Sequence, residues 1–298
     1  MRSDSQTHMI FEGDNGSRVD YYILAPGISL LFNRIYTDSW GRGDMPASDR
    51  LLNLNFCIDG RCDVSLKKNQ HAIVKKDQVC ISTIPPDKDF YYPGKRYEGV
   101  QLFIDLQVLE QLQENYLHYL GVDLQYIEQA FCSGEGIYFR RMSDHISGIV
   151  LKAWTAKEDP EIPALRYLSV QLLHEVMKFP VKSEGEVFFT KSQIAIVREA
   201  EALILQDLSK RITAKELADR FGISESSFKL YIKGILGDSY LSYFRRKRME
   251  KAAQLLKTTD LRVIDVAGSV GYENQGKFAK VFADFYGVSP LEFRRLSK

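Results

Sequence analysis

Long hydrophobic runs are missing from this sequence. No apolar stretch reaches the roughly 18 residues that a membrane-spanning helix needs. The first sixteen residues are polar and lack the hydrophobic centre of a secretory signal. Hydrophobic residues make up 45% of the 298 residues and charged residues 27%, a composition typical of globular proteins with two ordinary domains. We therefore expect a cytoplasmic protein without a membrane partner.

Cysteine is scarce, and the histidines are scattered. The four cysteines are Cys57, Cys62, Cys80 and Cys132, and none of them belongs to a Cys-x-x-Cys pair. We expect reduced, mostly buried thiols, as in cytoplasmic proteins. The five histidines include no His-x-His pair, and no recognisable catalytic group is present. The sequence thus predicts no metal site, no cofactor and no enzymatic activity.

The formal net charge of +1 conceals two regions of opposite sign. Residues 191–298 contain 20 Lys and Arg against 13 Asp and Glu, a net charge of +7. Residues 1–190 contain 20 basic and 26 acidic residues, a net charge of −6. A basic C-terminal third joined to an acidic remainder is typical of a nucleic-acid-binding domain with a separate sensor or assembly domain.

The N-terminal part begins as a strand-rich region. Leu52, Leu54 and Phe56 alternate with polar residues, Gly60 interrupts the run, and Cys62 and Val64 resume it. Short strands with turn signals about every ten residues predict an antiparallel β-barrel or sandwich over residues 20–105.

Residues 106–179 change to a helical period. We expect helices at 108–120 and 124–131, followed by an antiparallel helical hairpin within 141–178. This hairpin either packs on the barrel or forms the seam of a homodimer. The polar stretch 180–190 is the best candidate for a linker between domain 1–179 and domain 191–298.

The C-terminal third contains an internal repeat. Phe228, Ile232, Ile235, Gly237 and Ser239 recur fifty residues later as Phe278, Phe282, Phe285, Gly287 and Ser289. The repeated unit is a short helix, a turn through glycine and a second helix with one apolar edge. This is the layout of a helix-turn-helix, present twice in an all-α domain.

Each copy has a predicted second helix with one polar face. In the first copy Thr213 to Glu216 form a capping box, and Ser224 caps the second helix. In the second copy the second helix runs from about Glu273 to Phe285, with Phe278, Val281, Phe282 and Phe285 directed inward. The N-terminal turn of such a helix meets base edges, and Asn, Gln and Lys are suited to reading adenine and guanine.

A long helix from Tyr240 to Lys257 connects the two copies and supplies apolar residues, including Leu241 and Phe244, to both. A rigid connector would hold the two second helices about one DNA turn apart, roughly 34 Å. The run Arg245–Arg248 lies on it, and one or two of its side chains are expected to contact phosphate. The predicted DNA-contacting residues are Ser224, Glu225, Ser226, Ser227, Lys229, Lys233, Arg246, Lys247, Glu273, Asn274, Gln275, Lys277 and Lys280.

These motifs resemble the C-terminal signature of the AraC/XylS family of bacterial transcription regulators. The resemblance covers about 105 residues and is carried by Val266-Ala267, Gly271 to Phe282, Phe285 to Pro290 and Phe293-Arg294, with Leu217-Ala218, Ser224, Phe228, Gly237 and Leu255-Leu256 upstream. It implies a seven-helix domain that binds double-stranded DNA and controls transcription initiation, often by contacting RNA polymerase. It also implies that the N-terminal part is a cupin-like sensor and dimerisation domain.

The fold expected overall is therefore α+β, with a cupin-like antiparallel β-barrel, a helical hairpin and an all-α DNA-binding domain. A small-molecule effector in the barrel would contact Arg34, Tyr36, Trp40, Phe56, Tyr91 and Tyr92. The function expected is a sequence-specific transcription regulator, an activator, in the bacterial cytoplasm and on the nucleoid when bound. Two alternatives remain: a regulator controlled by a protein partner or by its abundance, and a barrel enzyme tethered to DNA.

Overall fold

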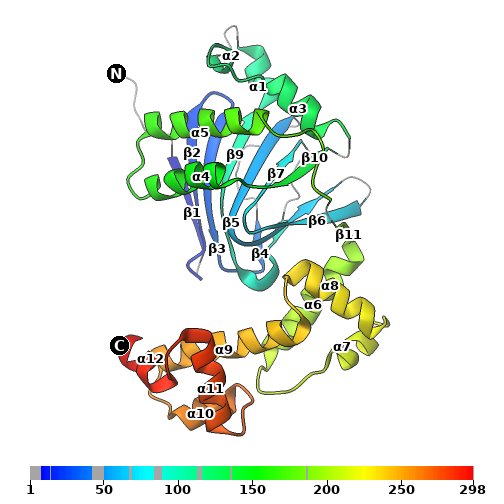
Figure 1. Ribbon diagram of the computed structural model, residues 1–298, viewed down its shortest axis with the longest axis vertical. Coiled ribbons are helices and arrows are strands. Elements are labelled where there is room, and N and C mark those ends of the chain that lie inside the picture. Colours follow the sequence, from blue (N-terminus) through cyan, green and yellow to red (C-terminus); the bar gives the residue numbers. More distant parts are fainter. Residues whose placement is uncertain are drawn as a thin grey trace. The chain divides into compact units, whose positions relative to one another are not determined.

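The computed structural model describes residues 8–13, 15–41, 50–66, 69–83, 89–112, 116–134, 136–185 and 187–297. The chain divides into two compact units, Met1–Lys191 and Ser192–Lys298. The first is a mixed unit of strands and helices, and the second is entirely helical among its described residues (Figure 1).

An antiparallel sheet organises the first unit. Its main path runs through β1 (His8–Glu12), β2 (Arg18–Ala25), β3 (Ile28–Ile35), β9 (Tyr97–Asp105), β5 (Leu51–Ser65), β6 (Gln70–Lys75) and β11 (Phe189–Thr190). Beside this path, β7 (Gln78–Ser82) pairs with both β5 and β10 (Ile137–Arg141). A separate two-stranded sheet joins β4 (Ser39–Gly41) to β8 (Asp89–Tyr91).

The sheet is open rather than a closed barrel. Among the described strands, β1 and β11 end the main path and do not pair with each other. The long strand β5 bends at Gly60, where φ is +79° and a Cβ would lie 2.0 Å from the carbonyl oxygen of Arg96. Before the bend β5 pairs with β7 and β9, and after it β5 pairs with β6. Glycine is therefore required where the strand changes partners.

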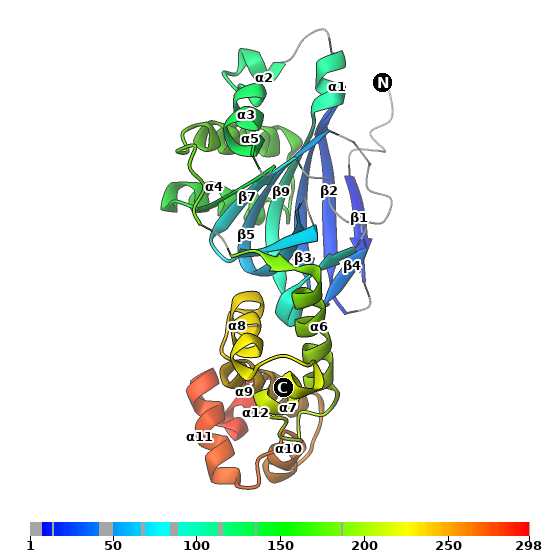
Figure 2. The same ribbon diagram turned by 90° about the vertical axis from the view of Figure 1, so that its right-hand side faces the viewer.

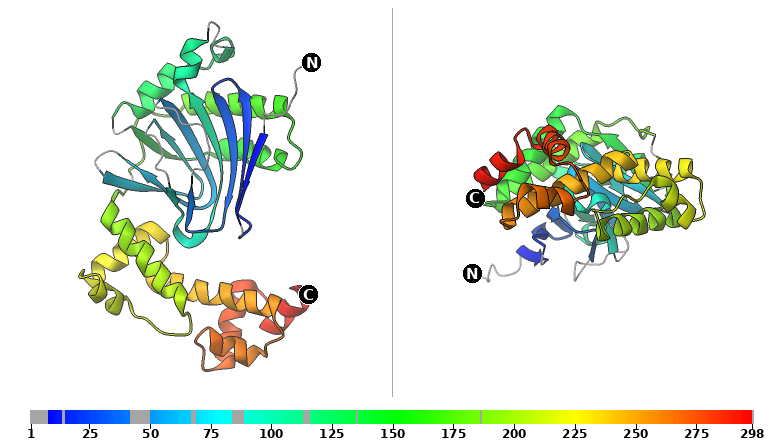
Figure 3. Two further views of the ribbon diagram at one scale, coloured as in Figure 1. Left: turned by 180° about the vertical axis from the view of Figure 1, so that it is seen from behind. Right: turned by 90° about the horizontal axis from the view of Figure 1, so that it is seen from below.

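The two faces of the sheet bury different side chains. One face carries an apolar set that includes Phe32, Leu54 and Leu102, and helices pack onto it. The other face carries Leu31, Cys57 and further aromatic and thiol side chains. This alternation follows from the period of two along each strand. Figure 2 shows the helices on one face, and Figure 3 shows the sheet from behind.

Among its described residues, the first unit has five α-helices after β9. They are α1 (Leu106–Gln111), α2 (Tyr116–Tyr119), α3 (Leu124–Cys132), α4 (Asp144–Ala156) and α5 (Ile162–Met177). The continuous helix expected at 108–120 is wrong, because α1 ends at Gln111 and Leu112 is extended. Residues 113–115 lie outside the described part. The expected hairpin is present as α4 and α5, whose inner faces pack on the apolar face of the sheet.

The predicted linker is attached to the first unit. The Pro180 carbonyl accepts a hydrogen bond from the Tyr138 hydroxyl at 2.8 Å, and Glu184 N donates to the Phe139 carbonyl at 3.0 Å. Phe189 then pairs with His71 of β6. Glu186 lies outside the described residues. Most of this polar segment is therefore held along two strands of the first unit up to the start of the next helix.

The described part of the second unit is formed by seven helices. They are α6 (Lys191–Gln206), α7 (Ala214–Arg220), α8 (Glu225–Leu236), α9 (Tyr240–Thr258), α10 (Val263–Ser269), α11 (Gln275–Tyr286) and α12 (Pro290–Ser297). The long α9 connects the pair α7–α8 to the pair α10–α11. Its side chains Met249, Ala252 and Leu256 join Phe278 and Phe282 in one apolar cluster.

Two residues expected in this core are exposed. Phe285 is 43% exposed, because the last turn of α11 packs the partly buried Tyr286 against Phe282 and Phe293 instead, with ring centroids 4.7 and 5.0 Å apart. Leu241 is 66% exposed, because the first turns of α9 direct Tyr240, Tyr243 and Phe244 inward.

Candidate nucleic-acid interface

Local sequence signals fix the first helix pair. The Thr213 hydroxyl accepts a hydrogen bond from Glu216 N at 3.2 Å, and the Glu216 carboxylate accepts from Thr213 N at 2.6 Å. This reciprocal cap starts α7. The turn passes through Gly222 at φ +65°, a conformation that favours glycine. The inner face of α8 then buries Phe228 and Ile232 completely, which fixes its opposite face outward.

The outward face of α8 is polar but partly neutralised. The Lys229 ammonium lies 2.6 Å from the Glu225 carboxylate, one helical turn away. Ser224 caps the helix by accepting from Ser227 N at 3.1 Å, and the two hydroxyls bond to each other at 2.8 Å. Ser226 and Lys233 are exposed. Two of the four serine and glutamate side chains in this first turn therefore stabilise the helix end.

The second helix pair repeats this arrangement. Gly271 makes the turn at φ +77°, and a Cβ there would lie 2.4 Å from the Ser209 carbonyl oxygen. Asn274 is the N-cap of α11, since its Oδ1 accepts from Lys277 N at 2.8 Å. Glu273 therefore precedes the helix, which starts at Gln275 and not at 273 as expected.

The polar face of α11 is open to solvent. Gln275, Lys277 and Lys280 are exposed. Within the described part of the chain, no ion pair is recorded for either lysine. Both ammonium groups are thus available to an external anion.

A groove of about 1120 Å³ lies between the two helix pairs within the second unit. It is lined by α8 and α11 side chains and floored by α9. Six of its lining residues are cationic and two are acidic. The cations are Arg211, Lys229, Lys233, Arg245, Arg248 and Lys277, and the acids are Glu225 and Glu273. A concave, positively charged surface of this kind suits a polyanionic backbone.

Four residues that line the groove were not among the predicted DNA contacts: Arg211, Arg245, Arg248 and Tyr272. Arg245 and Arg248 are three residues apart, so they share one face of α9. That spacing was a usable signal within the basic run. Arg211 stands in a loop and carries no comparable signal.

Arg248 joins the two halves of the unit. Its guanidinium stacks over Phe244 at 4.4 Å and over Tyr272 at 5.8 Å. Its Nη2 donates to the carbonyls of Ser209 and Lys210 at 3.2 Å each. Burial lowers the pKa of this guanidinium, which remains charged at neutral pH. Arg248 therefore positions the turn of the second pair as well as lining the groove.

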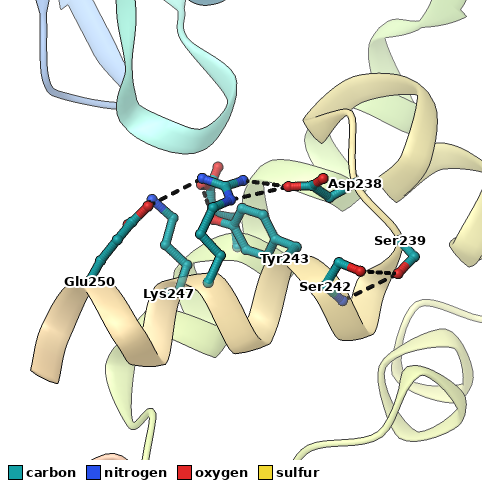
Figure 4. A network of polar contacts seen from close by, with 8 residues as sticks. Asp238, Ser239, Ser242, Tyr243, Lys247 and Glu250 are labelled. Atoms are coloured by element: carbon teal, nitrogen blue, oxygen red, sulfur yellow. Dashed lines mark hydrogen bonds and ion pairs between the residues drawn. The ribbon is translucent and has the colours of Figure 1, made fainter. Parts of the chain in front are cut away.

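Arg246 and Lys247 form internal ion pairs, whereas they were expected to contact phosphate. Lys247 is buried with its ammonium 2.9 Å from Glu250, and Arg246 lies 2.8 Å from Asp238 and 3.3 Å from Glu250. Figure 4 shows this network along α9. Burial lowers the pKa of Arg246, but the neighbouring carboxylates outweigh it and raise that pKa. This placement disfavours phosphate contacts, because both charges already have partners.

The network also anchors α6 on α9. The hydroxyl of Tyr243 donates to the carboxylate of Glu201, and both side chains are buried. The Arg246 guanidinium lies 5.2 Å and the Lys247 ammonium 5.7 Å from the Tyr243 ring centroid. These contacts hold a buried carboxylate in a hydrogen-bonded setting, which it requires.

The predicted effector residues of the first unit do not gather in one place. Phe56 lies in the apolar set under the helices, whereas Trp40 and Tyr92 belong to the set on the other face. Tyr36 is 37% exposed and its hydroxyl donates to Glu98 at 2.9 Å. Arg34 lies two residues after Phe32 on β3 and therefore on the same face of the strand, and its buried Nε has no hydrogen-bond partner. Tyr91 is buried at the end of β8.

Two further observations concern the described residues only. No group of three His, Cys, Asp or Glu side chains is arranged to hold a metal ion. No helix there combines the length and the apolar character that crossing a membrane requires. The four cysteines are buried and form no disulfide bond in the described part of the chain. Burial raises the pKa of the Cys57 and Cys132 thiols.

The helical unit matches known proteins. A family model described as a helix-turn-helix domain matches residues 217–296. The transcriptional activator AarP of Providencia stuartii is 32% identical over 105 residues, which are 35% of this chain and 78% of AarP. The transcriptional regulator AlkR of Acinetobacter baylyi is 33% identical over 85 residues, 28% of each chain. This chain thus spans under a third of the length of AlkR.

Among solved structures, the C-terminal domain of the response regulator AraT from Geobacillus stearothermophilus is 36% identical. The similarity covers 34% of this chain and 84% of that domain, with a TM-score of 0.33. The match to AarP covers most of that protein. The residues matched by the family model, 217–296, include α8, α9, α10 and α11. The chain belongs to the AraC/XylS family of transcription regulators.

Proposed function

We propose that this protein is a sequence-specific transcription regulator that docks α8 and α11 in successive major grooves on one side of the duplex. Each helix pair serves as one helix-turn-helix unit, with α7 and α10 as supporting helices. The observation that carries the proposal is the basic groove, which both second helices line and α9 floors. A rigid α9 would set their separation near one turn of DNA, roughly 34 Å.

The base contacts fall to the exposed N-terminal ends of these helices. On α11, Gln275 and Lys277 point into solvent without internal partners among the described residues. Gln matches the N6 and N7 groups of adenine, and Lys donates to the acceptors of guanine. On α8, Ser226 is exposed in the first turn, and Lys229 would have to leave Glu225 to reach a base. Lys233 is exposed in the last turn of α8, so it lies nearer to the flanking phosphates. Asn274 contributes mainly as a cap.

The phosphate contacts fall to the groove floor. Arg245 is exposed on α9 and lines the groove, and Arg211 lines it from the loop before α7. A phosphate strand that crosses between the two helix ends would meet both guanidinium groups. These contacts supply affinity without sequence preference.

The first unit acts as a cupin-like sensor and dimerisation module for this DNA-binding unit. Its open sheet, covered on one face by α4 and α5, offers the hairpin as a homodimer seam. AarP, an activator by name, supports a role in activation, and RNA polymerase is the partner proposed for it. A small-molecule effector would act by binding one arrangement of the protein more tightly than the other.

Control without a small ligand, through a partner protein or through abundance, is the second candidate. Phe56, Tyr91 and Tyr92, three of the expected effector contacts, are buried core residues. A metabolite screen by thermal shift distinguishes the candidates, because an effector raises the melting temperature by mass action.

Selection of binding sites from random duplexes tests the proposal as a whole. The full chain should recover a motif with two conserved blocks whose centres lie one helical turn apart. Gln275→Ala should relax preference in one block only. Recovery of no motif at moderate ionic strength would exclude sequence-specific reading.

A further inference from the structure

A second groove lies on the first unit, and none of the predicted effector contacts lines it. It has a volume of about 500 Å³, within the range of small-molecule sites. Helix α5 forms one wall and α2 another, and the facing ends of β2 and β3 complete it.

The floor of this groove is apolar. Leu24, Ile28, Leu117 and Leu173 line it and are each buried. At the rim, Leu120 is 49% exposed and therefore extends the apolar surface outward. When a hydrocarbon or aromatic group displaces water from a concave apolar surface of this size, the free energy of the system falls and binding is favoured.

One cation stands at the rim. The Nε atom of Arg166 donates to the Leu24 carbonyl at 2.6 Å, which fixes the orientation of the guanidinium. No ion pair is recorded for Arg166 among the described residues, and none of the residues lining the groove is acidic. A guanidinium has five N–H donors, so its Nη groups remain for a carboxylate in a fork geometry.

The remaining polar groups of the rim have internal partners. The Gln171 side-chain amide donates to the Tyr167 hydroxyl at 3.0 Å, and His174 Nε2 lies 2.7 Å from the Leu120 carbonyl. The Nε2–H tautomer satisfies that contact. Arg166 is therefore the group through which the rim recognises charge.

We propose that this groove binds an amphipathic carboxylate, with its apolar body on the leucine floor and its carboxylate on Arg166. A neutral molecule would leave the guanidinium without its anion, and an amine would be repelled by it. Binding itself is independent of the DNA-binding function. A regulatory role for the site rests on the function proposed above.

Calorimetric titration of the full chain with decanoate and decanol tests the site. The two probes share one hydrocarbon chain and differ in the headgroup. Decanoate should bind at least about tenfold more tightly, because a hydrogen-bonded ion pair adds to a common apolar contribution.

Three variants locate the binding. Arg166→Gln should abolish the preference for decanoate and leave decanol binding unchanged. Leu120→Asp, at an exposed position, should weaken both probes. Lys152→Gln removes an exposed cation on α4 and should change neither. Unchanged melting temperatures would show that the variants fold.

Equal decanoate affinity in Arg166→Gln and the unaltered protein overturns the site, as does failure of both probes to bind. If neither probe binds and Leu120→Asp converts a dimer to a monomer, the groove holds a second copy instead. DNA affinity measured with and without decanoate separates regulation from binding. If the ligand-free protein did not bind DNA at all, the proposed function would be refuted, whereas the proposed carboxylate site would be unaffected.

Discussion

The two helix pairs of the second unit share one plan but use their polar residues differently. In the first pair, polar side chains bind one another: Thr213 and Glu216 form a capping box, and Glu225 forms an ion pair with Lys229. In the second pair, α10 has no side-chain cap from Arg262, and the lysines of α11 have no recorded ion pair within the described chain. We infer that the first pair contributes more to stability and positioning, and the second more to base recognition.

The aromatic core of the second pair predicts the largest effect. Phe278→Ala should destabilise the helical unit by about 3–5 kcal/mol, because Phe278 is fully buried and its loss opens a cavity. Phe285→Ala is the matched control, and because Phe285 is 43% exposed it should cost less than about 1 kcal/mol. Urea unfolding followed by circular dichroism measures both. Similar losses for the two variants would contradict the assigned core.

The second largest effect is expected on base discrimination, which substitutions in α11 should reduce more than a substitution in α8. Gln275→Ala or Lys277→Ala should each remove about 1–3 kcal/mol of discrimination at one base pair. Lys229→Ala should remove less, because Glu225 already neutralises that ammonium. Binding to a panel of single-base-pair variants of the selected site gives these values. If Lys229→Ala had the larger effect, the order of the two helices would be reversed.

Arg245 and Arg246 are adjacent on α9, and we expect one to bind phosphate and the other to stabilise the fold. Arg245→Ala should weaken binding to all duplexes alike and reduce the salt slope by about 1. Arg246→Ala should leave the salt slope unchanged and lower stability, because its partners are Asp238 and Glu250. Binding constants measured across a salt series decide this. If Arg246→Ala reduced the salt slope and Arg245→Ala did not, Arg246 would be the residue that contacts phosphate.

The capping box should give the smallest effect, and one that depends on pH. Hydrogen bonds from Thr213 hold the pKa of Glu216 below its ordinary 4.5. A carboxylate whose pKa is lowered by folding stabilises the fold at pH values above its ordinary pKa of 4.5. This stabilisation is lost as the pH falls through the lower pKa of the folded state. Glu216→Gln should therefore lower the melting temperature at pH 7 more than at pH 3. An equal shift at both would show that ionisation is not involved.

Local signals in the sequence predicted much of the second unit. Thr213 and Ser224 initiate helices as expected, and Phe228 and Phe278 are buried as the repeat indicates. Such features depend on residues within one or two helical turns. Arg246 and Lys247, which were predicted to contact phosphate, have internal ion-pair partners instead of open charges. The inward face of α9 depends on α6, which supplies the buried Glu201. A run of four basic residues does not reveal which of them meet acids from other helices.

The first unit was less predictable, since its contacts join distant segments. Alternation identified the strands, but the open sheet depends on pairings such as Phe189 with His71, more than a hundred residues apart. The aromatic residues assigned to an effector were chosen by type, and the structure divides Phe56 and Trp40 between opposite faces. The groove at Arg166 requires α2, α5, β2 and β3 together and leaves no compact sequence signal.

Hydroxyl-radical footprinting of the full chain on its selected site tests most directly whether two helix ends, held by α9, read one side of the duplex. The account predicts two protected segments whose centres are separated by about one helical turn, 10 to 10.5 base pairs, on the same side of the DNA. Gln275→Ala should weaken protection in one segment and leave the other in place. A single protected segment, or two on opposite sides of the duplex, would contradict it.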